Sequence, residues 1–478
     1  MSNTPDLSAF IKAYDVRGLV GSQLTDEVVE ALGAGFVDEL GAAGQRIAVG
    51  HDMRDSSPGF VAAFARGATA RGAHVENLGL CSTDETYFVS GRDGVAAAMF
   101  TASHNPATYN GIKFCRAGAQ GVSLDTGLAG IRDRAQAYLD AGAIEPLPAD
   151  SVGTVTTRDV LADYAAYLRE LVDLSTVRPL TIVVDAGNGM GGMTVPAVLG
   201  TAAGLPALPL TIIPLYFELD GTFPNHEANP LEPANLVDLQ KAVVEHGADL
   251  GLAFDGDADR CFVVDELGQP VTPSAVAAIV ARREVERVRA AGETGAISVV
   301  HNLITSRIVP ETIEAVGAEP VRTRVGHSLI KDVMHATGAI FGGEHSAHYY
   351  FRDFWGADNG MLAALHLIAQ FGGYDGPLSQ LAAEYTPYTA SGEINSVVDD
   401  VPAAYTRVVE AFTGRAEIDD LDGLTFTGSL DGGSAGSGWY WFNVRPSNTE
   451  PLLRLNAEAE TPAVMEAIRD EVLALIRA

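Results

Sequence analysis

Cysteine is scarce in this chain of 478 residues, and long apolar segments are missing from it. Its three cysteines, Cys81, Cys115 and Cys261, lie far apart and follow no metal-binding spacing. This argues against a disulfide framework and fits a reducing compartment. No apolar run approaches the length of a membrane span, and residues 1–15 lack the apolar core of a signal peptide. We therefore expect a cytoplasmic protein that does not associate with a membrane.

Positive charge is also in short supply. Lysine and arginine together number 31 against 62 acidic residues, and the resulting net charge of −31 disfavours nucleic acid and anionic membranes as partners. Only four of the basic residues are lysines, and one of them, Lys113, follows a polar loop. An amine at this position can transfer a proton, which a guanidinium cannot. A point charge that binds phosphate is an equally good interpretation of Lys113.

The polar loop in question is T-A-S-H-N-P, residues 101–106, which follows the apolar run 95–100. Pro106 and Gly111 prevent regular structure from continuing, so we expect Ser103 where a buried strand opens into a loop. Proteins of the α/β class present reactive groups at such positions. Taken alone, the tripeptide S-H-N is explained more simply as an ordinary turn.

A second loop, D-G-D-A-D-R at residues 255–260, lies between the apolar runs 250–254 and 261–264. Three carboxylates within five residues repel one another, and a hard divalent cation with oxygen ligands relieves that repulsion. We therefore predict a Mg²⁺ site. An EF-hand is disfavoured because Arg260 stands where that loop requires glycine. A solvated acidic turn is the remaining alternative.

Two further loops carry groups that suit a phosphorylated sugar. R-P-S-N-T-E-P, residues 445–451, combines a guanidinium, two hydroxyls and an amide, as a phosphate dianion requires, although a polar hairpin explains it equally well. G-E-H-S-A-H, residues 343–348, offers a carboxylate and a hydroxyl to sugar hydroxyls, on weaker evidence.

These loops stand among six motifs along nearly the whole chain. In order they are Y-D-V-R-G (14–18), the serine loop, D-G-D-A-D-R, T-R-V-G-H-S (323–328), G-E-H-S-A-H and R-P-S-N-T-E-P. In this order they resemble the α-D-phosphohexomutase superfamily, specifically its phosphomannomutase/phosphoglucomutase branch.

The resemblance implies a role for each motif. Ser103 would carry a phosphoryl group, and Mg²⁺ would be bound by Ser103, Asp255, Asp257 and Asp259. The implied catalytic residues are Ser103, Lys113 as general acid/base, Arg17, Arg260, and the supporting His104 and His327. The implied substrate-binding residues are Tyr14, Glu344, Ser346, His348, Arg445, Ser447, Asn448 and Thr449. A hexose 1,6-bisphosphate would be both the intermediate and the activator.

A weak internal repeat predicts the architecture. Three strand-like runs, at residues 47–51, 182–185 and 297–302, each precede a helix-like stretch and a second strand that opens into a motif loop. We predict an α/β protein with three similar mixed-sheet domains and a smaller C-terminal α+β domain around a central cleft. The expected boundaries are residues 1–155, 156–262, 263–375 and 376–478.

One glycine-rich segment imitates a nucleotide site. G-N-G-M-G-G, residues 187–192, matches the dinucleotide-binding pattern, but residues 202–210 lack the acidic residue that should follow. We interpret it as a tight strand-to-helix turn.

We accordingly predict a phosphohexomutase that interconverts hexose 1-phosphate and hexose 6-phosphate, with mannose and glucose as the expected sugars. Phosphoglucosamine mutase is the nearest alternative. A Mg²⁺-dependent serine phosphohydrolase and a noncatalytic sugar-phosphate sensor are less consistent with the motifs. The expected partner is a small phosphosugar, and the expected state is a monomer or homodimer.

Overall fold

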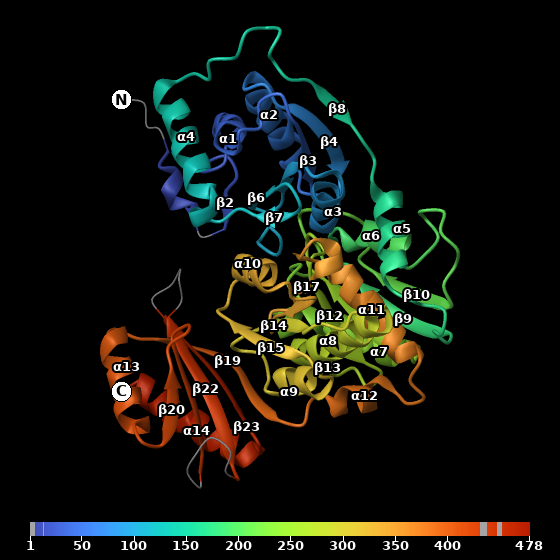
Figure 1. The fold of residues 1–478 in the computed structure, drawn as a ribbon, viewed down its shortest axis with the longest axis vertical. Coiled ribbons are helices and arrows are strands. Elements are labelled where there is room, and N and C mark those ends of the chain that lie inside the picture. The colour runs from blue at the N-terminus through green and yellow to red at the C-terminus, as the bar shows by residue number, and fades with distance from the viewer. Residues whose placement is uncertain (1–4, 13, 431–436, 447–451) are drawn as a thin grey trace.

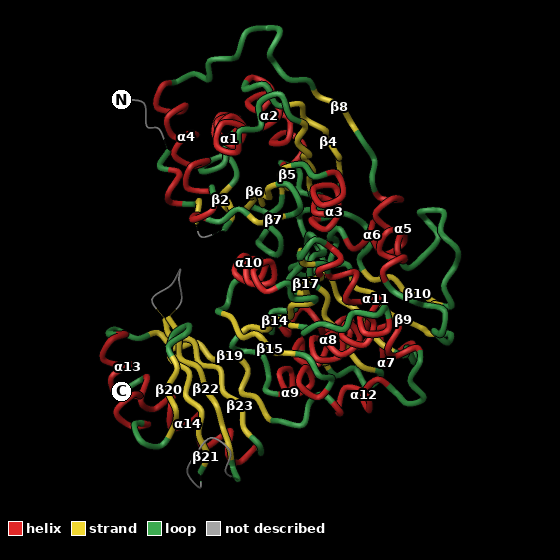
Figure 2. The backbone as a smooth tube through the Cα atoms, viewed as in Figure 1, coloured by secondary structure: helices red, strands yellow, loops and turns green. Residues whose placement is uncertain are grey.

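Four β-sheets follow one another along the chain (Figure 1). The structure is a computed structural model, and it describes residues 5–12, 14–430, 437–446 and 452–478. Three of the sheets are mixed and flanked by helices, and the fourth is antiparallel (Figure 2). The predicted fold class is confirmed.

The first domain contains an eight-stranded sheet in the order β1-β2-β6-β5-β3-β4-β8, with β7 paired to β6. Helices α1 and α2 approach so closely that a Cβ on Gly67 would lie 1.9 Å from the Glu30 carbonyl oxygen. The elements are β1 (Ile11–Lys12), β2 (Asp15–Leu19), α1 (Asp26–Leu40), β3 (Arg46–His51), α2 (Ser57–Ala70), β4 (His74–Leu80), α3 (Thr83–Asp93), β5 (Ala96–Phe100), β6 (Tyr109–Arg116), β7 (Gln120–Gly121), α4 (Leu128–Ala141) and β8 (Val155–Thr157).

The second domain has five strands in the order β10-β9-β11-β12-β13. Its sheet extends to Val271, past the expected boundary at residue 262, because β12 forms an antiparallel pair with β11. The elements are α5 (Leu161–Leu171), β9 (Leu180–Asp185), α6 (Gly191–Val198), β10 (Leu210–Leu215), α7 (Val237–His246), β11 (Leu250–Phe254), β12 (Cys261–Asp265) and β13 (Pro270–Val271).

The third domain repeats this order as β15-β14-β16-β17-β18. Helix α12 buries Leu378 and Leu381 in the core shared by the second and third domains. The first strand of the fourth sheet begins at Thr389, thirteen residues after the predicted start of the fourth domain at residue 376. The elements are α8 (Pro273–Ala290), β14 (Ser298–Asn302), α9 (Ile308–Ala315), β15 (Glu319–Thr323), α10 (His327–Thr337), β16 (Phe341–Gly343), β17 (Tyr349–Phe351), β18 (Ala357–Asp358), α11 (Gly360–Gly372) and α12 (Leu378–Glu384).

The fourth domain is an antiparallel sheet in the order β19-β23-β22-β21-β20, with its own hydrophobic core. Phe426 and Phe442 stack within that core at a ring-centroid distance of 4.5 Å. The expected C-terminal helix is α14. The elements are β19 (Thr389–Val397), α13 (Val401–Phe412), β20 (Ala416–Asp419), β21 (Leu424–Ser429), β22 (Trp439–Pro446), β23 (Leu452–Ala459) and α14 (Pro462–Ile476).

The three α/β domains place their motif loops at equivalent positions. The central strands β3, β9 and β14 each run parallel to both of their neighbours. One of those neighbours, β5, β11 or β16, is followed in the chain by a strand that pairs with it antiparallel. The loops at this turn connect β5 to β6, β11 to β12 and β16 to β17, and they carry Ser103, Asp255 to Arg260 and Glu344, respectively. The repeat predicted from the sequence is therefore present, and each copy contributes one functional loop.

Candidate active site

Ser103 lies in the loop after β5, in a left-handed backbone conformation with φ of 49°. Its amide donates to Thr101 Oγ1 at 2.8 Å, and its Oγ donates to Asp255 Oδ2 at 2.9 Å. The two loops are in close contact, since a Cβ on Gly256 would lie 2.4 Å from the Ser103 carbonyl oxygen. The hydroxyl and the acidic loop, 152 residues apart in sequence, thus form one site.

The acidic loop presents three fully buried carboxylates, Asp255, Asp257 and Asp259. One ligand oxygen from each lies within 4.8 Å of the others. Among the described residues, Oδ1 of Asp257 and Oδ1 of Asp259 are buried without a hydrogen-bond partner. Buried carboxylate oxygens that lack donors are expected where a cation binds.

Lys113, on β6, neutralises part of this charge. Its Nζ lies 2.7 Å from Asp257 Oδ2 and 2.6 Å from Asp259 Oδ2. Burial lowers the pKa of Lys113, but Asp257 and Asp259 outweigh burial and raise it well above the ordinary value. Lys113 is consequently protonated in this arrangement, and it can supply charge or donate a proton.

Arg260 and His104 flank the serine hydroxyl. Arg260 donates to Asp255 Oδ2 and, at 2.7 Å through Nη2, to His104 Nδ1. The same Nδ1 lies 3.2 Å from Ser103 Oγ. Burial, then Arg260 and Arg17, lower the pKa of His104 well below its ordinary value, so the ring is neutral and Nδ1 is an acceptor.

The environment of Asp255 differs from that of its two neighbours. Burial raises the pKa of Asp255 to about 7, with Arg260 opposing the rise and Asp259 and Asp257 adding to it. Burial also acts against ionisation of Asp257 and Asp259, yet Lys113 holds the pKa of both below the ordinary range. Lys113 thus favours the charged forms of Asp257 and Asp259, whereas burial disfavours the charged form of Asp255.

Arg17, on β2, reaches the same loop from another side. Its Nε donates to Asp15 Oδ2 at 2.7 Å, and its Nη1 donates to Asn105 Oδ1. Tyr14 immediately precedes β2 and lies within the electrostatic influence of Arg17, Glu344 and Lys113. The Y-D-V-R-G motif thus lies near both the serine loop and the loop that carries Glu344.

The third loop places Glu344 in a buried position. Asn302 Nδ2 donates to Glu344 Oε1 at 3.2 Å and Tyr350 Oη donates to Oε2 at 2.7 Å, while Ser346 Oγ lies 3.1 Å from His348 Nδ1. These contacts fix the carboxylate and the histidine that the sequence assigned to substrate binding.

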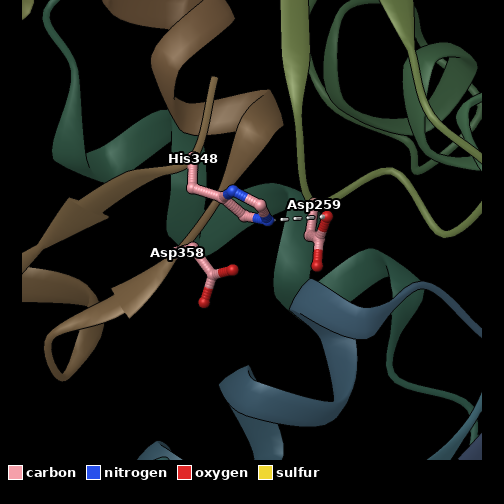
Figure 3. A group of neighbouring side chains, drawn as sticks. All are labelled: Asp259, His348 and Asp358. Carbon is pink, nitrogen blue, oxygen red and sulfur yellow. Dashed lines mark ion pairs between the residues drawn. The ribbon is translucent and has the colours of Figure 1, made fainter. Parts of the chain in front are cut away.

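His348 links this loop to the acidic loop (Figure 3). Its Nε2 lies 3.9 Å from Asp259 Oδ1, and Asp358 completes a second group that could hold a cation. Lys331, however, forms an ion pair with Asp358 at 2.6 Å, and both side chains are buried. Since that pair already balances the charge of Asp358, the group around Asp255 is the stronger metal-binding candidate.

The fourth domain contributes Arg445, at the end of β22. Arg445 is buried, donates to Glu393 Oε2 at 2.7 Å and to Asn456 Oδ1 at 3.2 Å, and acts electrostatically on His345 of the third loop. Burial lowers the pKa of Arg445. Ser447, Asn448 and Thr449 lie outside the described residues, as does the side chain of His327.

Several residues at the site escaped the sequence analysis. Thr83 Oγ1 donates to Asp257 Oδ2 at 2.6 Å, and Lys331, a basic residue beside a motif loop to which the sequence gave no individual role, pairs with Asp358. Arg54 contacts the serine loop, and Glu393 holds Arg445. Thr83 and Glu393 stand in unremarkable sequence, whereas the D-M-R-D turn around Arg54, directly after β3, was a detectable signal.

The G-N-G-M-G-G segment forms the expected tight turn between β9 and α6, with Gly187 and Asn188 at φ of 51° and 59°. Met190 N donates to the Gly256 carbonyl oxygen at 2.9 Å, so the turn supports the acidic loop. In the described part of the chain, no helix is both long and apolar enough to cross a bilayer.

Known families match all four domains. Residues 9–139, 162–268 and 272–388 match phosphoglucomutase/phosphomannomutase alpha/beta/alpha domains I, II and III, and residues 393–475 match the C-terminal domain of the same family. A protein of Xanthomonas campestris pv. campestris named "Phosphohexose mutases" is 39% identical over 98% of this chain and 99% of its own length. A phosphomannomutase of Salmonella montevideo is 36% identical over 97% of this chain and 98% of its own.

Solved structures show the same fold. A phosphoglucomutase/phosphomannomutase family protein from Burkholderia thailandensis superimposes with a TM-score of 0.82 at 28% identity, covering 98% of this chain and 97% of that one. A putative phosphomannomutase from Thermus thermophilus gives a TM-score of 0.76 at 22% identity, covering 97% and 98%. With every domain matched in order, the chain belongs to the phosphoglucomutase/phosphomannomutase family.

Proposed function

We propose that this protein is a phosphohexomutase that interconverts hexose 1-phosphate and hexose 6-phosphate through a phosphoserine at Ser103 and a 1,6-bisphosphate intermediate. The observation that carries the proposal is the contact between Ser103 Oγ and Asp255 Oδ2 within a buried group of three carboxylates. A hydroxyl beside such a group is suited to phosphoryl transfer, in which positioning and charge neutralisation supply most of the catalysis.

A divalent cation fits the acidic loop. Asp255, Asp257 and Asp259 offer hard oxygen ligands, and two of those oxygens are buried without a hydrogen bond among the described residues. We propose that these carboxylates and the Ser103 phosphate hold Mg²⁺. When bound, Mg²⁺ would stabilise the charge that develops during phosphoryl transfer.

The chain's own cations have complementary tasks. Arg260 is anchored on Asp255 beside Ser103, and Arg17 reaches the same loop through Asn105, so both guanidiniums would neutralise phosphoryl oxygens at Ser103. Lys113 is protonated because Asp257 and Asp259 raise its pKa, and it would donate that proton to the serine oxygen as the phosphoryl group leaves. The sugar hydroxyl that attacks the phosphoryl group would lose its proton late in the same step, because the transition state is loose, and the neutral Lys113 amine would take up that proton.

The other two loops would bind the sugar and its second phosphate. Glu344 is fixed by Asn302 and Tyr350, which suits a carboxylate that accepts hydrogen bonds from two sugar hydroxyls. Arg445 would bind the phosphate far from Ser103, together with Ser447, Asn448 and Thr449. A clamp separate from the metal allows the bisphosphate to be held in either orientation, so that each of its phosphates can face Ser103.

Mannose and glucose are the proposed sugars. They share the configuration of the 3- and 4-hydroxyls that Glu344 and Ser346 would read, and no residue identified here reads the 2-position. The similarity to a phosphomannomutase of Salmonella montevideo supports mannose. Glucosamine phosphate remains the second candidate.

The proposal is tested by a time course with Mg²⁺ and catalytic glucose 1,6-bisphosphate. Mannose 1-phosphate and glucose 1-phosphate serve as substrates, and both hexose 6-phosphate and free phosphate are measured. We expect conversion without phosphate release, and we expect EDTA to stop it and added Mg²⁺ to restore it. Stoichiometric phosphate release would instead identify a hydrolase, and turnover of glucosamine 1-phosphate alone would identify the amino-sugar enzyme.

A further inference from the structure

Arg54 occupies an unusual position for an arginine outside the motifs. It lies in the turn after β3, its side chain is only 2% exposed, and its guanidinium is directed at the loop that carries Ser103. It donates to four backbone carbonyl oxygens of that loop: Ser103 at 2.9 Å, Asn105 at 2.6 Å, Pro106 at 2.9 Å and Tyr109 at 2.9 Å. Each of these bonds joins segments about fifty residues apart in sequence.

The arginine is itself held rigidly. Asp52 is fully buried, and its Oδ2 accepts from Arg54 Nε at 3.1 Å. Asp52 Oδ1 accepts from the Arg54 amide at 3.1 Å and from Ser57 Oγ at 2.8 Å. A buried ion pair whose remaining oxygen is also hydrogen-bonded has little freedom to reorient.

The second domain covers the other side of Arg54. Its Cζ lies 5.1 Å from the centre of the Phe223 ring, and a Cβ on Gly221 would lie 2.6 Å from Arg54 Cα. Asn188, in the glycine-rich turn, holds the covering loop: its Nδ2 donates to the Glu218 carbonyl oxygen at 2.8 Å and its Oδ1 accepts from Asn225 Nδ2 at 2.8 Å. The turn that supports the acidic loop therefore also supports the cover over Arg54.

The contacts of Arg54 stabilise the backbone of the serine loop. The loop between β5 and β6 has no regular hydrogen-bond ladder, and Ser103 adopts a backbone conformation that costs free energy for a residue other than glycine. Four carbonyls bound to one planar guanidinium fix the path of the chain from Ser103 to Tyr109. A lysine has three donors and no planar fork, so it cannot make the same set of contacts.

We propose that Arg54 is a positioning residue: by holding the carbonyls of residues 103, 105, 106 and 109, it sets the direction from which Ser103 Oγ meets the phosphoryl group. The kinetic part of this proposal rests on the proposed function, whereas the ordering of the loop does not. The hydrogen bonds of Arg54 join it to Asp52 and to the backbone of residues 103–109. Its effect on catalysis would therefore pass through the position of the serine loop.

The test compares Arg54→Met with Arg54→Lys in two assays. A displacement of about 1 Å at a reacting atom lowers turnover by about 100-fold. We expect kcat of Arg54→Met to fall by roughly that factor with KM within about threefold, and Arg54→Lys to recover only part of it. Guanidinium ion at millimolar concentration should restore activity to Arg54→Met. A merely structural role would not produce this rescue or this separation of kcat from KM.

The second assay is hydrogen exchange followed by mass spectrometry, which requires no activity. Exchange should accelerate at residues 101–110 in Arg54→Met and remain unchanged within β14 (Ser298–Asn302). Arg46→Met is the matched control, because Arg46 lies on β3, the strand that leads into the turn of Arg54, and pairs with Glu76 and Asp93 away from the loop. It should change neither assay.

If Arg54→Met does not fold, the double variant Asp52→Asn/Arg54→Met replaces it in both assays, because it leaves no unpaired buried charge. Unchanged kcat together with unchanged exchange at residues 101–110 would overturn the proposal. If the wild-type protein converts no hexose phosphate, the proposed function fails, and the exchange assay still decides whether Arg54 orders the loop.

Discussion

Ser103 has two possible hydrogen-bond acceptors, Asp255 and the neutral ring of His104, at 2.9 and 3.2 Å. An acceptor on each side suits a hydroxyl that must lose its proton when it is phosphorylated. Arg260 bonds to both acceptors, so the serine, its two acceptors and the nearest guanidinium form a single unit.

The Ser103→Ala variant should therefore lose turnover by at least about 1,000-fold, because removal of a nucleophile leaves only binding and electrostatic effects. Binding of glucose 1-phosphate should remain within a few fold, as measured by calorimetry. Ser151→Ala, at an exposed serine of the first domain, is the control and should retain full activity. Retained turnover in Ser103→Ala would exclude a phosphoserine mechanism.

His301, on β14, provides a pH-dependent contribution to stability. It is buried, its Nδ1 lies 2.8 Å from Thr305 Oγ1, and burial lowers the pKa of His301 to about 4. In the unfolded chain the pKa is about 6.5. Below about pH 6.5 the unfolded chain binds a proton at His301 that the folded protein does not bind. Protonation therefore favours the unfolded state, and the free energy of unfolding decreases as the pH falls from about 6.5 towards 4.

At pH 5 the loss from this one group is about 2 kcal/mol relative to pH 7. We expect the urea midpoint of the wild-type protein to fall more between pH 7 and pH 5 than that of His301→Gln, which cannot be protonated. Equal falls in the two proteins would show that His301 is protonated in the folded state.

At the scale of elements, the three α/β domains use the same junction for different chemistry. The loop between the third and fourth strands of each repeat carries Ser103, the acidic group or Glu344. The carboxyl end of a parallel strand is where α/β proteins bind ligands, so repetition of the domain brings three such ends together. Gly256 is the point of closest approach between two of these loops.

Gly256→Ala tests that approach. The added Cβ would lie 2.4 Å from the Ser103 carbonyl oxygen, which is backbone and cannot rotate away. We expect a loss of stability of roughly 1–3 kcal/mol and a fall in kcat of about 100-fold as the loops separate. Gly59→Ala, in helix α2 with open space around its Cβ, should be neutral or slightly stabilising. A fully active Gly256→Ala variant would contradict the proposed dependence on loop contact.

At the scale of the whole molecule, the domains differ in how closely they are joined. The second and third domains share one continuous hydrophobic core that also includes part of the first, whereas the fourth has a core of its own. A buried ion pair of the third domain contacts the first: Lys331 of α10 pairs with Asp358 of β18, and its Nζ lies 4.1 Å from the centre of the Tyr87 ring of the first domain. This cluster holds α10 near the first domain (Figure 1).

Lys331→Met should destabilise the first three domains by about 3–5 kcal/mol, because it removes the cation that balances a buried carboxylate. Lys331→Met/Asp358→Asn should regain most of that loss, since neither charge remains. The check is differential scanning calorimetry, in which the transition of the fourth domain should stay in place. An unaltered main transition in Lys331→Met would show that the pair adds no net stability.

The sequence contained enough local information to predict the strands that precede the serine and acidic loops, and the two loops themselves. Apolar runs that give way to polar loops limit where β5 and β11 can end. Gly111, which was expected to interrupt regular structure, lies instead within β6 and pairs with Arg17 of β2. The domain limits remain predictions, and the sheet of the second domain continues past residue 262 to Val271. Strand β12 follows the acidic loop directly and pairs back onto β11, and α12 packs on the preceding core, neither of which leaves a composition change in the chain.

By itself, then, the sequence determined the strand–helix alternation of a threefold repeat and the residue types in each loop. Only the tertiary structure decided that Ser103 contacts Asp255, that Lys113 is bound between Asp257 and Asp259, and that Arg54 holds the serine loop. Spacing along a chain governs local geometry, whereas these contacts join residues about 50 to 150 positions apart. Their distances and pKa shifts depend on burial, which exists only once the domains have packed together.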